Sequence, residues 1–425
     1  MRLSKRMSVV GMLLIGAISV VGCSSNSEPT TTASGATTNN NTSSSTASET
    51  TSNTSATVDT ANSGYTDWEE KSGIFITDET EAELYEKAKE EGSVVLYSIS
   101  SRCETIAEAF NEKYPGVICE PYDISSDELL EKVTREHAAG RNVADVVHIK
   151  DQDGTLYNEY VQNKIFYNYQ PDDIMEHIDP AYSEYVTPVY IELTQLFYNG
   201  EAYPDGAPVD TLWDLTREEW NGKIVMQNPV DNSSLMSWIA GFTFDDTAQE
   251  LADLYEVEFG EPLVLSAECP NAGYEFLKQL KANDLVYTTS SDEASEAIGT
   301  RGQTNPPIGF AASSKMRKNE SNDWVLEPVN VLPNTGVPQI NGLYMVEGSE
   351  HTAAAKLLIR FIMGGDDGTS EGYEPFNTLG GWPVRDDIQP VDGVLPLSEL
   401  NLGTYDPMAT YDVINDVYDF WLMLP

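Results

Sequence analysis

An alternation of strand and helix patterns between residues 93 and 151 constrains the fold of this chain more than any other feature. Apolar runs rich in β-branched residues at 93–97, 117–122 and 144–149 predict three buried strands. Between them, apolar residues at four-residue spacing over 106–114 and 129–137 predict two helices. This β-α-β-α-β order favours a parallel sheet with right-handed crossovers, and therefore an α/β fold.

Polar and basic residues follow the first and third of these strands. The first strand leads to Ser100, Ser101 and Arg102, and the third leads to Lys150 and Asp151. Because the carboxyl ends of parallel strands meet at one edge of a sheet, these five residues are candidate ligand-binding residues. Arginine grips an oxyanion with two parallel N–H groups, and a helix start adds free backbone amides. The alternative is that Arg102 and Lys150 pair with surface carboxylates such as Glu104 or Asp151.

The order of strand, polar turn and helix returns in the second half of the chain. A strand over 223–227 is followed by Asn232, Ser233 and Ser234, and then by a helical run over 235–240. The free amides of such a helix start bind anions, so these three residues are further candidates for ligand contacts. For Asn232 and Ser233, a plain helix N-cap is the alternative.

The N-terminus has the pattern of an exported lipoprotein. Basic residues precede an apolar segment over 7–21 that is too short for a comfortable membrane span, and Cys23 ends it in a sequence resembling a bacterial lipobox. We therefore expect a signal peptide over 1–22 and lipidation of Cys23, with an ordinary signal peptide and an accidental cysteine as the alternative. Residues 24–64 contain mainly Ser, Thr, Asn and Ala, which predicts a disordered tether.

Size and charge narrow the class of protein. The roughly 360 residues after the tether are too many for one simple hydrophobic core, and this length suits two lobes. The chain has 24 Lys and Arg against 69 Asp and Glu, a net charge of −45, which argues against nucleic acid as a partner because its phosphates would be repelled. Three cysteines remain beside Cys23, an odd number that fits no disulfide framework, so Cys103, Cys119 and Cys269 should be free thiols.

Several segments together resemble a known family. "EEGSVVLYS", "AFNEKYPGV", "AGRNVADVV", "TLWDLTREEWNGKIVMQNP", "AAAKLLIRFIMGG" and "GWPVRDDI" occur in the order found in the extracellular solute-binding proteins of ABC importers. The resemblance covers about residues 82–388 and is strongest to the branch of the ferric-ion-binding proteins. It implies a two-lobed α/β fold of the type II periplasmic-binding-protein class, with crossing strands that join the lobes.

The resemblance also implies a division into lobes and a region of the cleft. Lobe 1 would contain residues 65–190 and 330–370, and lobe 2 residues 191–329 and 371–425. The region after the short helix at 293–298 lines the cleft in related proteins, which makes Arg301 a candidate. The turn over residues 380–385, "GGWPVR", would pack between the lobes.

The chain departs from the ferric-binding pattern where that branch holds its metal. The branch uses a His after the first strand, a Glu after the third and a pair of adjacent tyrosines, whereas this chain has Ser101, Lys150 and no Tyr-Tyr pair. A lysine beside a trivalent cation would be repelled. The tyrosines over 157–185 keep ferric binding open as an alternative, and no metal ligand is assigned.

These observations predict a membrane-anchored, monomeric receptor on the outer face of a bacterial cell membrane. It would capture a small solute, an anion such as an organic phosphate or phosphonate, and deliver it to the permease of an ABC importer without a cofactor. An enzyme is not expected, because no G-x-S-x-G, H-E-x-x-H or metal-spaced Cys/His cluster occurs. A Ser-Lys hydrolase and an adhesin are the weaker alternatives.

Overall fold

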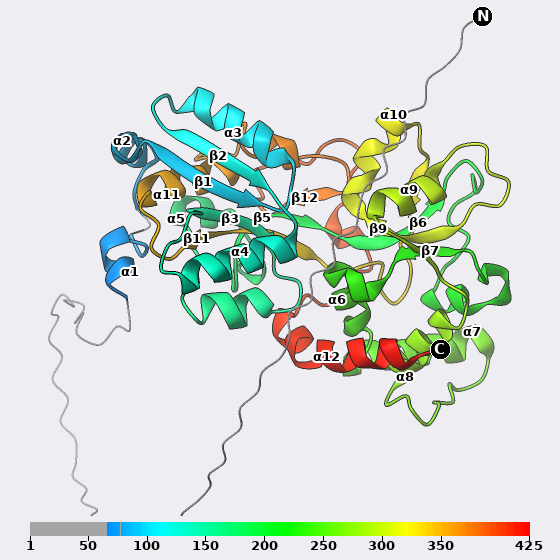
Figure 1. Cartoon of the computed structure of the whole chain (residues 1–425). Helices are drawn as coiled ribbons and strands as arrows, with labels where there is room; N and C mark the ends of the chain where they lie inside the picture. Colours follow the sequence, from blue (N-terminus) through cyan, green and yellow to red (C-terminus); the bar gives the residue numbers. More distant parts are fainter. Residues whose placement is uncertain (1–65, 77) are drawn as a thin grey trace, which may run out of the picture. The chain divides into compact units, whose positions relative to one another are not determined.

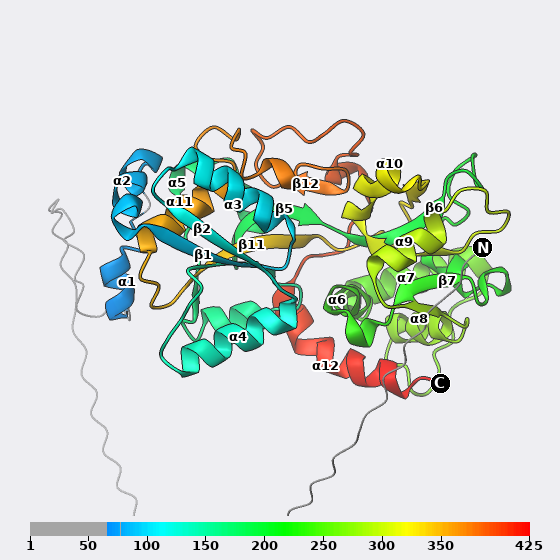
Figure 2. The same ribbon diagram turned by 45° about the horizontal axis from the view of Figure 1, so that its top comes forward.

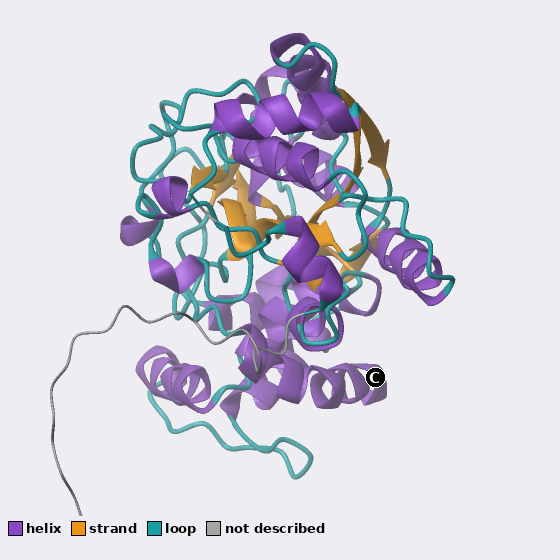
Figure 3. Ribbon diagram, turned by 90° about the vertical axis from the view of Figure 1, so that its left-hand side faces the viewer, coloured by secondary structure: helices purple, strands orange, loops and turns teal. Residues whose placement is uncertain are grey.

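The computed structural model describes residues 66–76 and 78–425, and the predicted signal peptide, Cys23 and tether lie outside them. Two β-sheets organise the described chain (Figure 1). None of its described helices is long and apolar enough to cross a membrane. Figure 3, which views lobe 1 from its end, shows helices on both faces of the strands, as expected for an α/β fold.

The first sheet has the strand order β12-β5-β11-β3-β1-β2, and β4 pairs with β11. Its strands are β1 (Ser93–Ser98), β2 (Ile118–Asp123), β3 (Val146–Lys150), β4 (Phe166–Tyr167), β5 (Thr187–Glu192), β11 (Gln339–Val346) and β12 (Gly381–Pro383). Strand β1 is parallel to β2 and β3, whereas β11 is antiparallel to β3 and β5. The predicted parallel core of lobe 1 is therefore confirmed.

Helices of lobe 1 bury the apolar faces that the sequence spacing predicts. They are α1 (Asp67–Ser72), α2 (Glu81–Glu91), α3 (Arg102–Lys113), α4 (Ser126–Ala138), α5 (Asp172–Met175) and α11 (Thr352–Ile362). On α3, Ile106 and Phe110 are buried, and on α4, Leu129 and Val133 are buried, whereas His137 is half-exposed. Ser125 caps α4 by accepting a hydrogen bond from the Glu128 amide, which stabilises the helix start.

The second sheet has the order β10-β6-β9-β7-β8. Its strands are β6 (Thr194–Asn199), β7 (Ile224–Gln227), β8 (Val286–Thr288), β9 (Ile308–Ala312) and β10 (Leu326–Pro328). The helices of lobe 2 are α6 (Ser233–Gly241), α7 (Asp245–Phe259), α8 (Ala272–Lys281), α9 (Ser291–Gly299), α10 (Asn319–Asn322) and α12 (Pro407–Met423). Strand β7 is parallel to both β8 and β9, so their carboxyl ends lie at one edge.

Short 3₁₀ and π segments connect these elements. They are η2 (Leu156–Val161), η3 (Pro180–Tyr182), η4 (Leu212–Thr216), η5 (Glu218–Trp220), η6 (Pro229–Asp231), η7 (Ser313–Lys318), η8 (Glu374–Phe376) and η9 (Leu397–Glu399). Of these, η2 is the π-helix.

The chain crosses between the lobes where β5 continues into β6, with Leu193 alone between the two strands (Figures 1 and 2). The Leu193 amide donates to Ser313 Oγ at 2.9 Å, and the Ser313 amide donates to the Leu193 carbonyl at 2.7 Å. Ser313 Oγ also donates to the Gly380 carbonyl at 2.5 Å. The turn that contains Gly380 therefore packs at the junction of the lobes, as the resemblance implies.

The C-terminal segment divides differently from the expected boundaries. Residues 371–425 were assigned to lobe 2, yet β12 pairs with β5 in the first sheet, and Phe376 and Trp382 are buried in the first core. Only the last helix matches the assignment, since Val417 and Trp421 of α12 belong to the second core. Strand pairing decides this division, because β12 supplies hydrogen bonds to an edge that β5 would otherwise expose.

The three described cysteines, Cys103, Cys119 and Cys269, are buried free thiols, as predicted. Burial raises the pKa of Cys103 to about 11 and that of Cys269 to about 12, and it raises the pKa of Cys119 further. Thiols held protonated in this way are poor nucleophiles and metal ligands, which makes a structural role the natural assignment.

Candidate functional site

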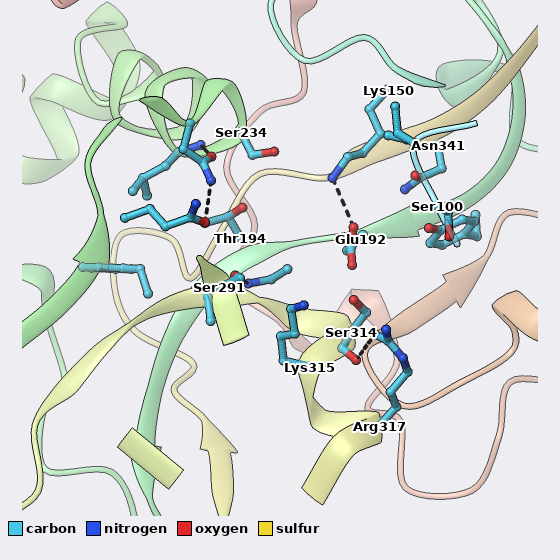
Figure 4. A pocket seen from close by; sticks show the side chains of 18 of the residues that line it. Ser100, Lys150, Glu192, Thr194, Ser234, Ser291, Ser314, Lys315, Arg317 and Asn341 are labelled. Atoms are coloured by element: carbon cyan, nitrogen blue, oxygen red, sulfur yellow. Dashed lines mark hydrogen bonds and ion pairs between the residues drawn. The ribbon is translucent and has the colours of Figure 1, made fainter. Parts of the chain in front are cut away.

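A cavity of about 260 Å³ lies between the two lobes. Its walls come from the carboxyl ends of β1 and β3, from β5, β9 and β11, and from the starts of α3, α6 and α9 (Figure 4). The lining residues are Ile99, Ser100, Arg102, Lys150, Tyr190, Glu192, Thr194, Gln227, Asn232, Ser234, Leu235, Ser291, Phe310, Ala311, Ala312, Ser314, Lys315, Arg317 and Asn341.

The charge of this lining is opposite to that of the whole chain. Lobe 1 contributes Arg102 and Lys150, and lobe 2 contributes Lys315 and Arg317. Glu192 is the single acidic residue among the described residues that line the cavity, although the sequence has nearly three acidic residues for every basic one. Low-dielectric walls strengthen electrostatic interactions inside such a cleft, so it favours an anion.

Arg102 begins α3 and is half-buried against aromatic rings. Its Nη1 donates to the Tyr190 hydroxyl at 3.2 Å, and its guanidinium carbon lies 5.3 Å from the centroid of the Phe376 ring. Within residues 66–76 and 78–425, no carboxylate forms an ion pair with Arg102, so the alternative pairing with Glu104 is not observed. Arg102 lines the cavity and has guanidinium N–H donors besides the one bonded to Tyr190, which suits oxyanion binding.

Lys150 ends β3 and pairs with Glu192 rather than with its neighbour Asp151. Lys150 Nζ lies 3.1 Å from Glu192 Oε2 and 3.5 Å from Gln339 Oε1. Burial alone would raise the pKa of Glu192, but the charge of Lys150 and a hydrogen bond from Ser314 lower it to about 2. Glu192 is therefore ionised at neutral pH, and Lys150 retains one further N–H donor for a ligand beside those used by Glu192 and Gln339.

Two basic residues of lobe 2, Lys315 and Arg317, line the cavity although the sequence did not point to them. Lys315 pairs with Asp292 at 3.0 Å, and Arg317 Nη1 donates to the Ser314 carbonyl at 2.7 Å. Desolvation and the charge of Arg102 lower the pKa of Arg317, so the two guanidinium groups repel each other across the cleft. The signal for both was present, because "SSKMR" directly follows the strand β9 as Ser100–Arg102 follow β1.

Neutral donors complete the lining. Ser100, Ser234, Ser291 and Ser314 present hydroxyl groups from both lobes. Asn341 is 1% exposed, lies opposite Lys150 in the β11–β3 register, and its Nδ2 has no hydrogen-bond partner within the described chain. A buried amide N–H without a partner costs about 1–3 kcal/mol, and a ligand oxygen would satisfy it.

A wider cavity of about 810 Å³ adjoins the first and shares Lys150, Asn232 and Ser234 with it. Ser233, Ser125 and Ser126 lie in its walls, at the starts of α6 and α4. Asn232 Oδ1 accepts from the Leu235 amide at 2.8 Å, so the predicted alternative of an N-cap describes its side chain.

Three predicted residues lie outside both cavities. Ser101 is exposed and makes no cap hydrogen bond to α3. The Asp151 carboxylate is 1% exposed and accepts from the amides of Leu156 and Tyr157 at 3.3 and 2.9 Å, so it caps η2. The prediction for Arg301 is wrong. Arg301 lies before the start of β9 and pairs with Asp323 at 2.7 Å, whereas it is the carboxyl end of β9 that faces the cavity.

Among residues 66–76 and 78–425, no group of metal ligands converges in the cavity. Of the residues that the structure describes, His177, Asp386 and Asp387 are the group whose ligand atoms lie within 4.8 Å of one another, and none of them lines it. Arg385 also pairs with Asp387 at 2.7 Å, which neutralises one of the carboxylates. Tyr190 lines the cavity, yet burial and the charge of Glu192 raise its pKa far above the usual value, which disfavours a phenolate ligand.

Two α/β lobes, joined by crossing strands around a polar cleft, define a two-lobed periplasmic binding protein. Residues 101–364 match the family model described as "Bacterial extracellular solute-binding protein", and the chain belongs to this family. The predicted family is thereby confirmed. No curated protein has a significant sequence match to the chain.

Solved structures support the same fold at low sequence identity. Iron-bound HitA from Pseudomonas aeruginosa is 15% identical with a TM-score of 0.56, and the match covers 78% of this chain and 99% of that one. AfuA from Actinobacillus pleuropneumoniae with bound fructose-6-phosphate is 17% identical, with coverages of 79% and 98% and a TM-score of 0.58. The Trichodesmium protein IdiA (FutA) with iron and citrate is 16% identical, with coverages of 78% and 99% and a TM-score of 0.54.

Proposed function

We propose that this solute-binding protein captures a small organic phosphate or phosphonate and delivers it to the permease of an ABC importer. The observation that carries this proposal is the convergence of Arg102, Lys150, Lys315 and Arg317, two from each lobe, around a cavity with one carboxylate. An anion that contacts both lobes would stabilise the closed state through contacts that only that state offers. The phosphate ester bound to AfuA is consistent with such a ligand on this fold.

Phosphoryl groups suit this lining better than a bare metal ion does. Arginine presents a planar fork that matches the oxygens of a phosphate, while lysine adds a point charge. A free Fe(III) ion would meet four positive side chains and no phenolate. The ferric hypothesis survives in one form, because an anionic iron chelate fits the same charge pattern, and the Trichodesmium neighbour holds iron together with citrate.

The solute carried by the native protein distinguishes these candidates. Protein purified without refolding would be analysed by native mass spectrometry and by elemental analysis for phosphorus and iron. The proposal predicts a bound mass that contains phosphorus, and calorimetric binding of glycerol phosphate to protein stripped of that ligand. Stoichiometric iron without phosphorus would contradict the organic-phosphate proposal and favour an anionic iron chelate as the solute.

We further infer that Cys23, which lies outside the described residues, anchors the protein to the outer face of the membrane through lipid. Two or more acyl chains give stable anchoring where one does not. Cys23→Ala should release the protein into the medium without loss of solute binding, as judged by fractionation and calorimetry. A variant that still sediments with membranes would contradict the anchor.

A further inference from the structure

Glu192 is the carboxylate in the wall of this cationic cavity. It ends β5, directly before the chain crosses to lobe 2, and is 7% exposed. Its Cα pairs with Gln339 of β11 on one side and with Gly381 of β12 on the other. Strands on both sides therefore hold its backbone in place, and the contacts with Lys150 and Ser314 hold its carboxylate at the cavity wall.

An ionised carboxylate can only accept hydrogen bonds. Its two oxygens offer about four acceptor sites, of which Lys150 and Ser314 occupy two. The sites that remain face a cavity in which an anionic solute is held by the surrounding cations. An oxygen of that anion would be repelled by Glu192, whereas an O–H or N–H group would be bound.

We infer that the solute carries a hydroxyl or ammonium group close to its anionic group, and that Glu192 receives this donor and determines specificity. The inference rests on the proposed anionic solute and names its class more closely, as an amino- or hydroxy-substituted organic phosphate or phosphonate. The anionic group is gripped by Arg102 and Arg317, and the unpartnered Nδ2 of Asn341 supplies a further donor to it. Glu192 then accepts a hydrogen bond from the hydroxyl or ammonium group at the other end of this short ligand.

Three phosphonates that differ in one group test this inference on the full chain. Calorimetry would compare ethylphosphonate with 2-hydroxyethylphosphonate and 2-aminoethylphosphonate, with inorganic phosphate as a reference anion. The two donor-bearing ligands should bind at least about tenfold more tightly than ethylphosphonate, since hydrogen bonds to a charged group are among the stronger ones. This comparison needs no variant.

A variant then assigns the preference to Glu192. In Glu192→Gln, the preference for the ammonium ligand should fall by at least about tenfold, and ethylphosphonate should bind more tightly than it does to the original protein. Asp292→Asn is the matched control, because Asp292 pairs with Lys315 and Lys318 but does not line the cavity. That control should keep the original order of affinities.

The outcomes separate this inference from the proposed function. Equal affinity for the three phosphonates would overturn the inference and leave an anionic solute intact. Absence of binding by all three and by inorganic phosphate would overturn both. A Glu192→Gln protein that folds and keeps the full preference would remove Glu192 as the determinant.

Discussion

At the scale of single residues, the lining of the cleft is mainly basic although the chain as a whole is strongly acidic. A protein with a net charge of −45 places four basic side chains around one cavity. The two arginines of this cavity, Arg102 and Arg317, have no carboxylate partner among the described residues. Salt screens charges beyond about 8 Å at physiological ionic strength. The acidic exterior therefore does not cancel the local attraction for an anion.

Removal of either arginine should weaken solute binding. Arg102→Ala and Arg317→Ala are each expected to cost about 1.5–3 kcal/mol in the binding free energy of an organic phosphate, the range for hydrogen bonds to charged groups. The free energy of unfolding without ligand should change by less than about 1 kcal/mol. Calorimetry and urea unfolding would measure the two effects.

Arg301→Ala is the matched control, since Arg301 pairs with Asp323 on the surface and lies outside both cavities. Native-like affinity in the Arg102 and Arg317 variants would remove these residues from the site. A loss of affinity in the Arg301 variant would equally contradict the assignment.

His148 makes stability depend on pH. It is 2% exposed, its Nδ1 lies 2.9 Å from Ser98 Oγ, and burial together with the charges of Arg102 and Lys150 lowers its pKa to about 3. The unfolded chain takes up this proton near pH 6.5, whereas the folded protein does not. The contribution to stability is therefore present above pH 6.5 and is lost as the pH falls toward 3.

This residue should contribute a loss of about 2 kcal/mol in the free energy of unfolding between pH 7 and pH 5. In His148→Gln, that decrease should be smaller than in the original protein by about this amount, as measured by urea unfolding at both pH values. His177→Gln, at a more exposed histidine that faces Asp386, serves as the control. An unchanged pH dependence in the His148 variant would show that His148 is not buried in its neutral form.

At the scale of elements, the site depends on how closely the β12 turn approaches η7. Gly380 has a φ of +77°, and a Cβ at this position would overlap the Ser313 carbonyl and lie 2.8 Å from the Ser314 amide. Ser313 and Ser314 begin the segment that carries Lys315 and Arg317. The turn therefore positions the two basic residues of lobe 2.

Gly380→Ala should displace that segment. We expect a loss of about 1–3 kcal/mol in the free energy of unfolding from overpacking, and weaker binding of organic phosphates. Gly393→Ala is the control, because Gly393 has a φ of +92° but its nearest atom, Leu379 Cδ2, would lie 3.6 Å away. It shares the strain of a positive φ without the clash, so equal effects of both variants would refute the close-approach argument.

At the scale of the whole molecule, binding should close the two lobes. Each lobe has its own core, and the cavity is lined by residues from both. Arg102 of lobe 1 and Arg317 of lobe 2 have no carboxylate partner among the described residues and repel each other, which opposes closure. An anion between them removes that opposition.

Saturating organic phosphate should therefore decrease the radius of gyration in small-angle scattering. At one hundred times the dissociation constant, it should also add about 2.7 kcal/mol to the free energy of unfolding. In the Arg102→Ala protein both effects should be smaller at the same concentration, with a stabilisation of about 0.3–1.3 kcal/mol. A rise in melting temperature without compaction would indicate a preformed pocket rather than closure.

The part of the site that could be predicted follows from one rule, that ligands bind at the carboxyl ends of parallel strands. Arg102 follows β1 and Lys150 ends β3, and because these strands are parallel the two residues meet at one edge, as the sequence indicates. The same rule applied to β9 finds Lys315 and Arg317, which follow the strand, and rejects Arg301, which precedes it. That error came from choosing a residue by its resemblance to a region rather than by its place along a strand.

Local pattern determined the order of strands and helices, the buried faces of α3 and α4, and the family, because these depend on short stretches of the sequence. Only the tertiary structure decided that Lys150 pairs with Glu192, that Asn341 lines the cavity and that β12 joins the first sheet. Each depends on the register between strands that are tens to hundreds of residues apart. Spacing along the chain carries no information on that register, and a shift of one residue would turn Glu192 to the other face.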